Sequence, residues 1–327
     1  MKRLVHGVDV LIAMPIVLVY TLSCGAYAQD KTAAPSDMAA CYWQDALNGV
    51  FCDHTISTAF EVGDHSVDWK YQELEHFPHL ETIKHAFDRW NWLDGTGTIA
   101  ATPLPWLKLS VGSEVEDFAR ISEYDYTRVV GIVRLPPPTK IDTVGNYWLW
   151  QFVEANAKIY DSGPGDGRYF AHLFAGAAFV PDQSDITAQS RVDAGAEAGA
   201  RWALSPEFAV NAKTVLEFDH FSYLDQNIIY PSARLLVSDD PLGFAIGPVY
   251  DGAVLTSSDG GVGAHPTVTR LGVDALVQPM ARSDIAVLRG MIIDLKAEHN
   301  LGQADFLSIG QSTGMNYSAS LTLNFPY

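Results

Sequence analysis

The sequence predicts an all-β fold, namely a transmembrane antiparallel up-and-down β-barrel of about 12 strands, with a range of roughly 10 to 14. Three observations lead to this fold class. Many runs alternate apolar and polar side chains over unusual lengths, the chain opens with an export signal, and its last residues form an alternating strand that ends in an aromatic residue. Together they favour a membrane-spanning barrel over a soluble β-protein.

The clearest alternation lies between Arg191 and Tyr223, where two period-two runs flank a short turn. Successive side chains of a strand point to opposite faces, so each run has one apolar face and one charged face. Soluble strands cluster near about 5 to 6 residues, whereas a tilted strand needs about 9 to 11 residues to cross a bilayer. Trp202 and Phe208 lie beside the turn, as expected of an aromatic girdle. The alternative is a hairpin of a soluble calyx or sandwich.

The first 28 residues have the parts of a secretory signal peptide. Lys2 and Arg3 precede an apolar run from Val10 to Leu22, and Ala26-Tyr27-Ala28 forms a small-x-small cleavage site. No later apolar run approaches the length of a spanning helix. A chain that crosses lipid without such helices must close into a barrel, because every backbone amide needs a partner there.

The mature chain is strongly acidic. The full sequence has 21 basic and 39 acidic residues, and removal of Lys2, Arg3 and Asp9 leaves 19 against 38, a net charge of −19. This charge excludes a typical nucleic-acid-binding protein.

Cys41 and Cys52 are the two cysteines that remain, and in an exported chain they favour a disulfide over free thiols.

The domain organisation that follows is a signal peptide over 1–28, a periplasmic N-terminal segment over 29–60 and an outer-membrane barrel over 61–327.

The range 78–92 has helical spacing but equally fits a strand plus loop. Histidines are frequent between 54 and 85, and solvated loop histidines are favoured over a surface metal site because a two-ligand helix motif is lacking. We expect no metal and no cofactor.

Further alternating runs supply the other strands: 106–118, 126–135, 144–160, 168–180, 228–237, 242–255, 267–278, 285–298 and 315–327. Trp148 and Trp150 share the polar parity near the start of one run and are assigned to a rim. Arg289 falls on the apolar side of its run without explanation. The count places the turn at Pro103–Pro105 opposite the turns at Ser205 and Pro279, so one strand between 120 and 143 is missed or overcounted.

The final run, Met315 to Tyr327, alternates apolar residues with small polar ones, and the printed chain stops at its terminal aromatic. It resembles the C-terminal targeting strand of Gram-negative outer-membrane barrels, and departs from it at Pro326, which lacks a ladder donor. The resemblance implies location in the outer membrane, contact with outer-membrane lipid and lipopolysaccharide, and delivery by the outer-membrane assembly machinery.

Charged residues on the polar parity are expected to line the lumen. The set comprises Glu154, Lys158, Arg168, Arg191, Asp193, Glu197, Arg201, Lys213, Glu217, Asp219, Arg270, Asp274 and Lys296. Both signs are interleaved, which fits either a charge-paired filling or a narrow wet channel. The function predicted is a passive, porin-like channel or an envelope component, and not an enzyme.

Two other functions stay open. FAGAAF at 174–179, FAIGP at 244–248 and TRLG at 269–272 are similar to segments of the small barrel family associated with bacterial cellulose biosynthesis, which implies an accessory or structural role in exopolysaccharide export and polysaccharide as a partner. His220-Phe221-Ser222 resembles the His-x-Ser pair of outer-membrane lipid hydrolases, but those families continue with Asn and Gly where this chain has Tyr223-Leu224.

Overall fold

The structure is a computed structural model, and it describes residues 35–50, 52, 55–74, 80–130, 133–134, 139–163, 167–180, 189–221, 226–257, 267–304 and 314–326. The signal peptide and Tyr327 lie outside these residues. Among the described residues, no helix has both the length and the apolar character needed to cross a membrane.

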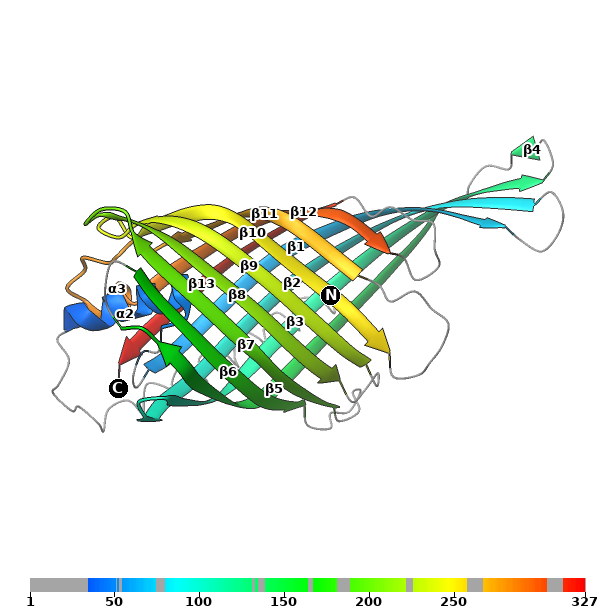
Figure 1. Cartoon of the computed structure of the whole chain (residues 1–327). Helices are drawn as coiled ribbons and strands as arrows, with labels where there is room; N and C mark the ends of the chain where they lie inside the picture. Colours follow the sequence, from blue (N-terminus) through cyan, green and yellow to red (C-terminus); the bar gives the residue numbers. More distant parts are fainter. Residues whose placement is uncertain are drawn as a thin grey trace.

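Twelve long antiparallel strands close into a barrel, as predicted (Figure 1). They are β1 (Thr55–Leu74), β2 (Leu80–Leu104), β3 (Leu107–Val130), β5 (Thr139–Asp161), β6 (Gly167–Val180), β7 (Gln189–Ala203), β8 (Phe208–Phe221), β9 (Gln226–Asp239), β10 (Phe244–Ser257), β11 (Thr267–Val277), β12 (Met291–Ala304) and β13 (Met315–Pro326). Each long strand pairs with the next, and β13 pairs with β1 to close the ring. The two-residue strand β4 (Val133–Arg134) extends the far tip of β3.

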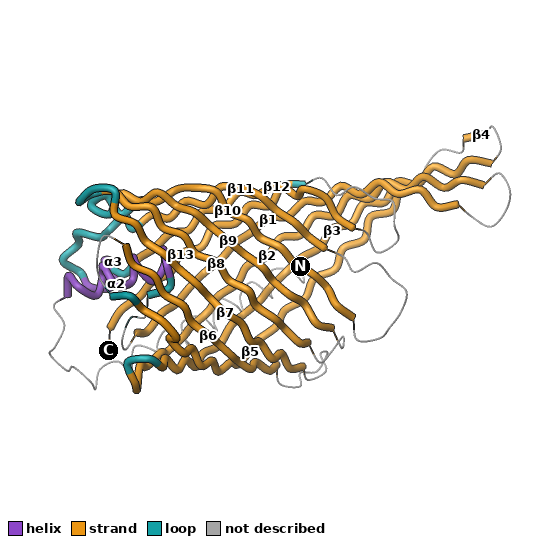
Figure 2. Tube along the Cα trace, in the orientation of Figure 1, coloured by secondary structure: helices purple, strands orange, loops and turns teal. Residues whose placement is uncertain are grey.

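The two ends of the barrel differ. At one end lie the tight connections after Leu104, Asp161, Ala203 and Asp239, the start of β1 and the last residues of β13. We call this the short-turn end, and the opposite end the far end. The helix α2 (Pro35–Asn48) and the one-turn helix α3 (Ala286–Arg289) also lie at the short-turn end, on the left of Figure 1 and in purple in Figure 2.

Alternation of exposure along the strands matches the predicted parity. On β7, Val192 is 52% exposed on the outside, whereas its neighbour Asp193 is 8% exposed and faces the lumen. On β8, Leu216 is 55% exposed and Asp219 only 4%. An apolar outer wall around a charged interior is the arrangement expected of a barrel in lipid.

Aromatic side chains cover glycines on the inner wall. A Cβ placed on Gly112 would lie 2.4 Å from Phe152 Cζ, and one on Gly195 would lie 2.4 Å from Phe174 Cζ. The rings therefore fill the space beside the glycine on the neighbouring strand, a contact that helps to fix register and curvature in barrels. Glycine alternates with charged residues on the inner parity of β7 because the adjacent ring needs that space.

The region between 120 and 143 corrects the strand count. β3 continues without a break through Val130, so the run 126–135 does not form a strand of its own, and its last part falls in β4 and in residues outside the described set. With one strand fewer, the turn near Pro105 and the turn near Ser205 lie at the same end. The conflict in the predicted count came from dividing one strand of 24 residues into two.

The predicted strand 285–298 is wrong at its start. Residues Ala286–Arg289 form α3, and β12 begins only at Met291. The parity of a strand does not apply inside a helical turn, which explains why Arg289 broke the alternation. The carbonyl of Arg289 accepts a hydrogen bond from Gln278 Nε2 at 2.8 Å, which ties this turn to the end of β11.

The N-terminal boundary also differs from the prediction. β1 begins at Thr55, six residues before the expected boundary at 61, and β2 takes up Leu80 onward, so the range 78–92 contributes a strand and not a helix. The pairing of β1 with both β2 and β13 outweighs the helical spacing in 78–92, since a closed barrel satisfies every backbone group.

Candidate functional site: the lumen and its N-terminal helix

The short-turn end of the lumen contains α2, which belongs to the predicted periplasmic segment 29–60. Apolar residues recur at helical spacing in Ala39, Tyr42, Trp43 and Leu47, and they are buried. Residues 35–48 of the predicted N-terminal segment therefore form a packed helix. The physical reason is that this apolar face meets a matching apolar patch inside the barrel.

The apolar patch belongs to four neighbouring strands. Tyr42, Trp43, Leu47 and Cys52 form one buried cluster with residues of the barrel wall. The wall residues are Leu236 on β9, Ala245 on β10, Leu276 on β11 and Ile292 on β12, all at most 5% exposed. Apolar residues on the inward parity are unusual in a wet barrel, and here they form the seat of the helix.

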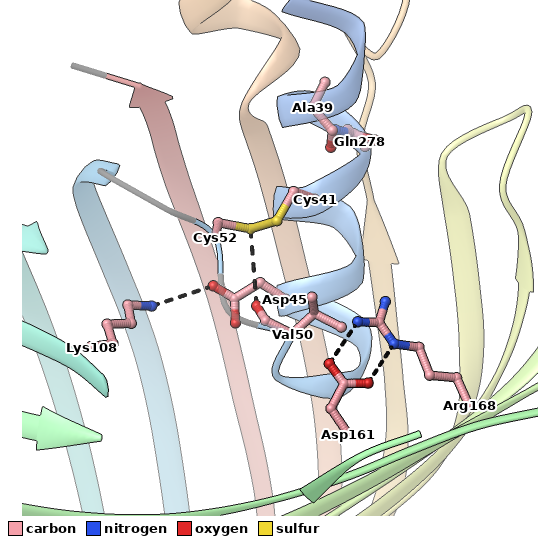
Figure 3. Close-up of a disulfide and its surroundings, with 9 residues drawn as sticks. All are labelled: Ala39, Cys41, Asp45, Val50, Cys52, Lys108, Asp161, Arg168 and Gln278. Carbon is pink, nitrogen blue, oxygen red and sulfur yellow. Dashed lines mark hydrogen bonds and ion pairs between the residues drawn. A yellow bond between two sulfur atoms is a disulfide. The ribbon is translucent and has the colours of Figure 1, made fainter. Parts of the chain in front are cut away.

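A disulfide ties the middle of α2 to the segment that follows the helix, and a glycine ends the helix. Cys41 and Cys52 are bonded, as predicted, with their Cα atoms 5.8 Å apart (Figure 3). Gly49 follows the helix with φ of +80°, and its N–H donates to the carbonyl of Asp45 at 2.7 Å. A left-handed glycine after the last residue is the usual helix C-cap. A Cβ at Gly49 would also lie 1.5 Å from Glu197 Oε1, so the end of the helix lies against the Glu197 side chain of β7.

Polar contacts fasten the middle of α2 to the wall. Trp43 Nε1 donates to Asp240 Oδ1 at 3.2 Å. Arg234 Nη2 on β9 donates to the carbonyl oxygen of Ala46. Lys108 of β3 lies 3.7 Å from Asp45 across the lumen, as Figure 3 shows.

The two ends of α2 are fastened in the same way. Near the first turn, Gln278 Nε2 donates to the carbonyl of Ala39 at 3.1 Å. At the last residue, Asn48 Nδ2 donates to Asn211 Oδ1 on β8 at 3.2 Å. Both asparagines are fully buried. The helix is therefore held along its length by side chains of β8, β9 and β11.

Ion pairs line the wall around the helix. Arg168 makes two hydrogen bonds to Asp161, at 3.1 and 3.0 Å, and Lys158 lies 3.6 Å from the same carboxylate. Arg201 pairs with Asp240 at 2.5 Å. The Asp240 carboxylate therefore accepts hydrogen bonds from both the Trp43 indole and the Arg201 guanidinium.

A second set of ion pairs lies on β7 to β12. Lys213 pairs with Glu197 at 2.9 Å, and Lys296 pairs with Asp251 at 2.7 Å. Arg234 lies 3.2 Å from Asp274 and 4.0 Å from Asp294. Arg234 therefore contacts two wall carboxylates and the helix backbone together.

A carboxylate-rich cavity of about 340 Å³ lies on the β3 to β8 side of the lumen. Its acidic lining comprises Glu114, Glu154, Asp193, Glu197 and Glu217. The cationic side chain in the same lining is Arg191, whose guanidinium lies 5.6 Å from the centre of the Trp150 ring. The local charge is thus negative, which attracts cations.

A smaller cavity of about 160 Å³ lies on the β8 to β12 side. Lys213, Arg234 and Lys296 line it together with Asp251 and Asp274. Both cavities share Val215. The lumen therefore has an acidic side next to a side where three cations meet two carboxylates.

The structure places the predicted lumen residues as follows. Glu154, Arg191, Asp193, Glu197 and Glu217 line the larger cavity, and Lys213, Asp274 and Lys296 line the smaller one. Lys158, Arg168 and Arg201 lie in ion pairs nearer the short-turn end. Asp219 is buried opposite Asp193, and Arg270 lies at a half-buried position opposite Asp251.

Several residues of the lumen were absent from the prediction. Arg234 and Asp251 lie on β9 and β10, whose alternation looked weak because inward apolar residues such as Leu236 contact α2. Trp150 was assigned to a rim, yet it is 1% exposed and packs with Ala178 and Val180 on the inside. The helical spacing of residues 39–47 was the signal that could have revealed the helix.

The other motifs give little chemistry. His220 Nδ1 lies 2.9 Å from Asn227 Oδ1, and Ser222 falls outside the described residues, as do the side chains of the predicted histidine-rich region. Within the described ranges, no group of three or more His, Cys, Asp and Glu side chains has the arrangement of a metal site.

Comparison with known proteins identifies no family. No family profile matches the chain, and no curated protein matches it. Among solved structures, an outer membrane channel from Pseudomonas putida F1 is 9% identical, with 85% of this chain and 98% of that chain covered and a TM-score of 0.42. The translocator domain of autotransporter NalP from Neisseria meningitidis is 11% identical, with coverage of 89% and 94% and a TM-score of 0.35. A Pseudomonas aeruginosa FadL homologue is 10% identical, with coverage of 90% and 91% and a TM-score of 0.34.

Proposed function

We propose that the chain is an integral outer-membrane β-barrel that acts as a passive channel, with its short-turn end in the periplasm and closed at rest by α2. The observation that carries the proposal is that a disulfide-fastened helix packs inside the mouth of a lumen with charged walls. The apolar exterior supports placement in lipid, and short periplasmic turns are usual in such barrels.

The contacts of α2 support a closed resting state. The helix combines one apolar cluster with polar contacts to β8, β9 and β11, and its C-terminal end touches Glu197, which lines the larger cavity. Release of the helix therefore connects that cavity to the short-turn end. The proposal assigns no catalytic step to any residue.

The test is single-channel conductance in planar bilayers. We expect the wild-type chain to give few or brief openings, and Trp43→Ala to give frequent, stable ohmic steps, because loss of a buried Trp costs about 3 to 5 kcal/mol of packing. Trp106→Ala is the matched control, since Trp106 is 50% exposed in the turn between β2 and β3.

A second variant separates a filled lumen from a firmly closed one. A chain that lacks residues 35–48 and carries Cys52→Ser removes the helix altogether. Stable steps from this chain support the channel. If it folds, judged by heat-modifiable migration on gels, and stays silent, the channel is disproved and the accessory role in polysaccharide export becomes the better proposal.

A further inference from the structure

The outer wall of the barrel carries a hollow of about 740 Å³. It crosses five strands, β2, β3, β5, β6 and β7. Phe179, Val153 and Val192 in its lining are 54%, 56% and 52% exposed, so they point away from the lumen. The outer wall of a barrel is convex, so a hollow of this size leaves room for a bound molecule.

Strand register divides the outward lining into two adjacent rows. The row nearer the short-turn end is apolar throughout: Ile99, Val111, Val153, Ala177 and Val192 are successive cross-strand partners. Contact of this apolar surface with a hydrocarbon chain is favourable.

The row nearer the far end is different in character. Gly97, Ser113, Gln151, Phe179 and Ser190 are successive partners in it. Ser113 Oγ donates to Gln151 Oε1 at 2.8 Å, an arrangement that leaves the amide NH₂ of Gln151 as a hydrogen-bond donor. The hollow is thus amphipathic along the barrel axis.

The level of the polar row matches a membrane interface. Trp202 Nε1 donates to Tyr169 OH at 2.9 Å, and this outward aromatic pair marks the short-turn boundary. Twelve residues of β7 separate Trp202 from Ser190. At about 3.3 Å per residue and a tilt of about 40°, that is roughly 30 Å along the axis, the thickness of the hydrocarbon core.

We propose that this hollow is a binding site for one acylated lipid of the outer leaflet, the lipid A part of lipopolysaccharide. An acyl chain lies along the valine row, and Gln151 and Ser113 contact oxygen atoms at the head of the chain. The far end faces the outer leaflet under the proposed function, on which this inference rests. Arg191 is the cationic residue in the described lining of the hollow, and its guanidinium lies 5.6 Å from the centre of the Trp150 ring and lines the inner cavity. The outward side chains are uncharged, which favours contact with an acyl ester, acyl amide or sugar hydroxyl over contact with a phosphate.

Native mass spectrometry of the refolded full chain tests the site. Nanodiscs of phosphatidylcholine with about 5 mol% lipid A are the probe, and detergent exchange follows. We expect wild type to retain one lipid A. We expect Ala177→Trp, whose indole fills the hollow, to show at least about tenfold lower lipid A occupancy, equivalent to about 1.4 kcal/mol. Ala175→Trp is the matched control, because Ala175 is an outward residue on the same strand outside the hollow.

A second variant and a second lipid make the result decisive. Gln151→Leu tests the polar contact without adding bulk, and we expect reduced lipid A occupancy. Equal retention by Ala177→Trp and wild type overturns the site, and equal retention of phosphatidylethanolamine in place of lipid A overturns the choice of lipid. Planar-bilayer conductance of the same variants separates the two proposals, because lipid A occupancy does not depend on an open lumen.

Discussion

The side-chain amide of Asn48, the last residue of α2, donates a hydrogen bond to the side-chain oxygen of Asn211 near the start of β8, 3.2 Å away. Asn211 also accepts from Arg201 Nη1 at 3.2 Å and donates to Ser238 Oγ at 2.8 Å. One fully buried amide thus joins the helix to three strands, β7, β8 and β9.

We therefore predict that Asn211→Leu destabilises the barrel by about 1 to 3 kcal/mol, because it leaves buried partners without hydrogen bonds. Urea unfolding in detergent micelles, followed by tryptophan fluorescence, measures the loss. Thr214→Leu is the control, since Thr214 lies on the exposed outer face of the same strand. Equal midpoints for the two variants would show that the Asn48–Asn211 contact contributes nothing.

Loss of the disulfide is expected to loosen α2 while the barrel stays folded. Cys41 and Cys52 close a short loop with a sequence separation of 11, and cross-links of this length contribute about 3 kcal/mol to the loop they close. In Cys41→Ser/Cys52→Ser we expect faster chymotrypsin cleavage within α2, at Tyr42, Trp43 or Leu47, and unchanged heat-modifiable migration of the remaining chain. Unchanged cleavage would mean that the packing of Trp43 alone holds the helix.

Lys213 is expected to set ion selectivity once the lumen is open. It pairs with Glu197, which also lines the carboxylate-rich cavity. In a chain that carries Trp43→Ala, the added change Lys213→Met leaves that carboxylate unpaired and should shift the reversal potential toward cation selectivity in a KCl gradient. Arg282→Met is the control, because Arg282 donates to the carbonyl of Pro241 in an exposed contact outside the lumen. An identical reversal potential in both variants would place the conduction path elsewhere.

Arg234 and Asp274 form an ion pair beside α2, and Arg234 also donates to the carbonyl of Ala46 in the helix. Asp274 is fully buried, so Arg234→Met should cost about 3 to 5 kcal/mol by leaving its charge without a partner. The double variant Arg234→Met/Asp274→Leu removes both charges and is expected to recover most of that loss in urea unfolding. A double variant no more stable than the single one would argue against a charge-pairing role.

Alternation predicted the strands best where the inner face is charged. On β7 and β8 the predicted inward and outward sets agree with the structure, because one face is apolar and exposed and the other packs against charged partners. On β9 to β12 the pattern weakens at Leu236, Leu276 and Ile292, which face inward and contact α2. Strand alternation alone cannot predict apolar residues that face inward to contact a helix.

The structure places the predicted lumen residues in two cavities and in ion pairs, several of them with partners that the prediction lacks. Glu197 and Lys213 share the inward parity of adjacent strands, so their meeting could be foreseen. Asp161 and Asp240 lie beside turns, where period-two reasoning ends, and each receives a cation there. Strand register decides such contacts, and register depends on long-range pairing.

The sequence by itself determined the class of fold, the outward and inward faces of most strands and the cysteine pair, because these follow from local periodicity and from the residues present. The tertiary structure decided the position of α2, the partners of each lumen charge and the hollow on the outer wall. These depend on which strands become neighbours when β13 pairs with β1, and closure of the ring is a property of the whole chain.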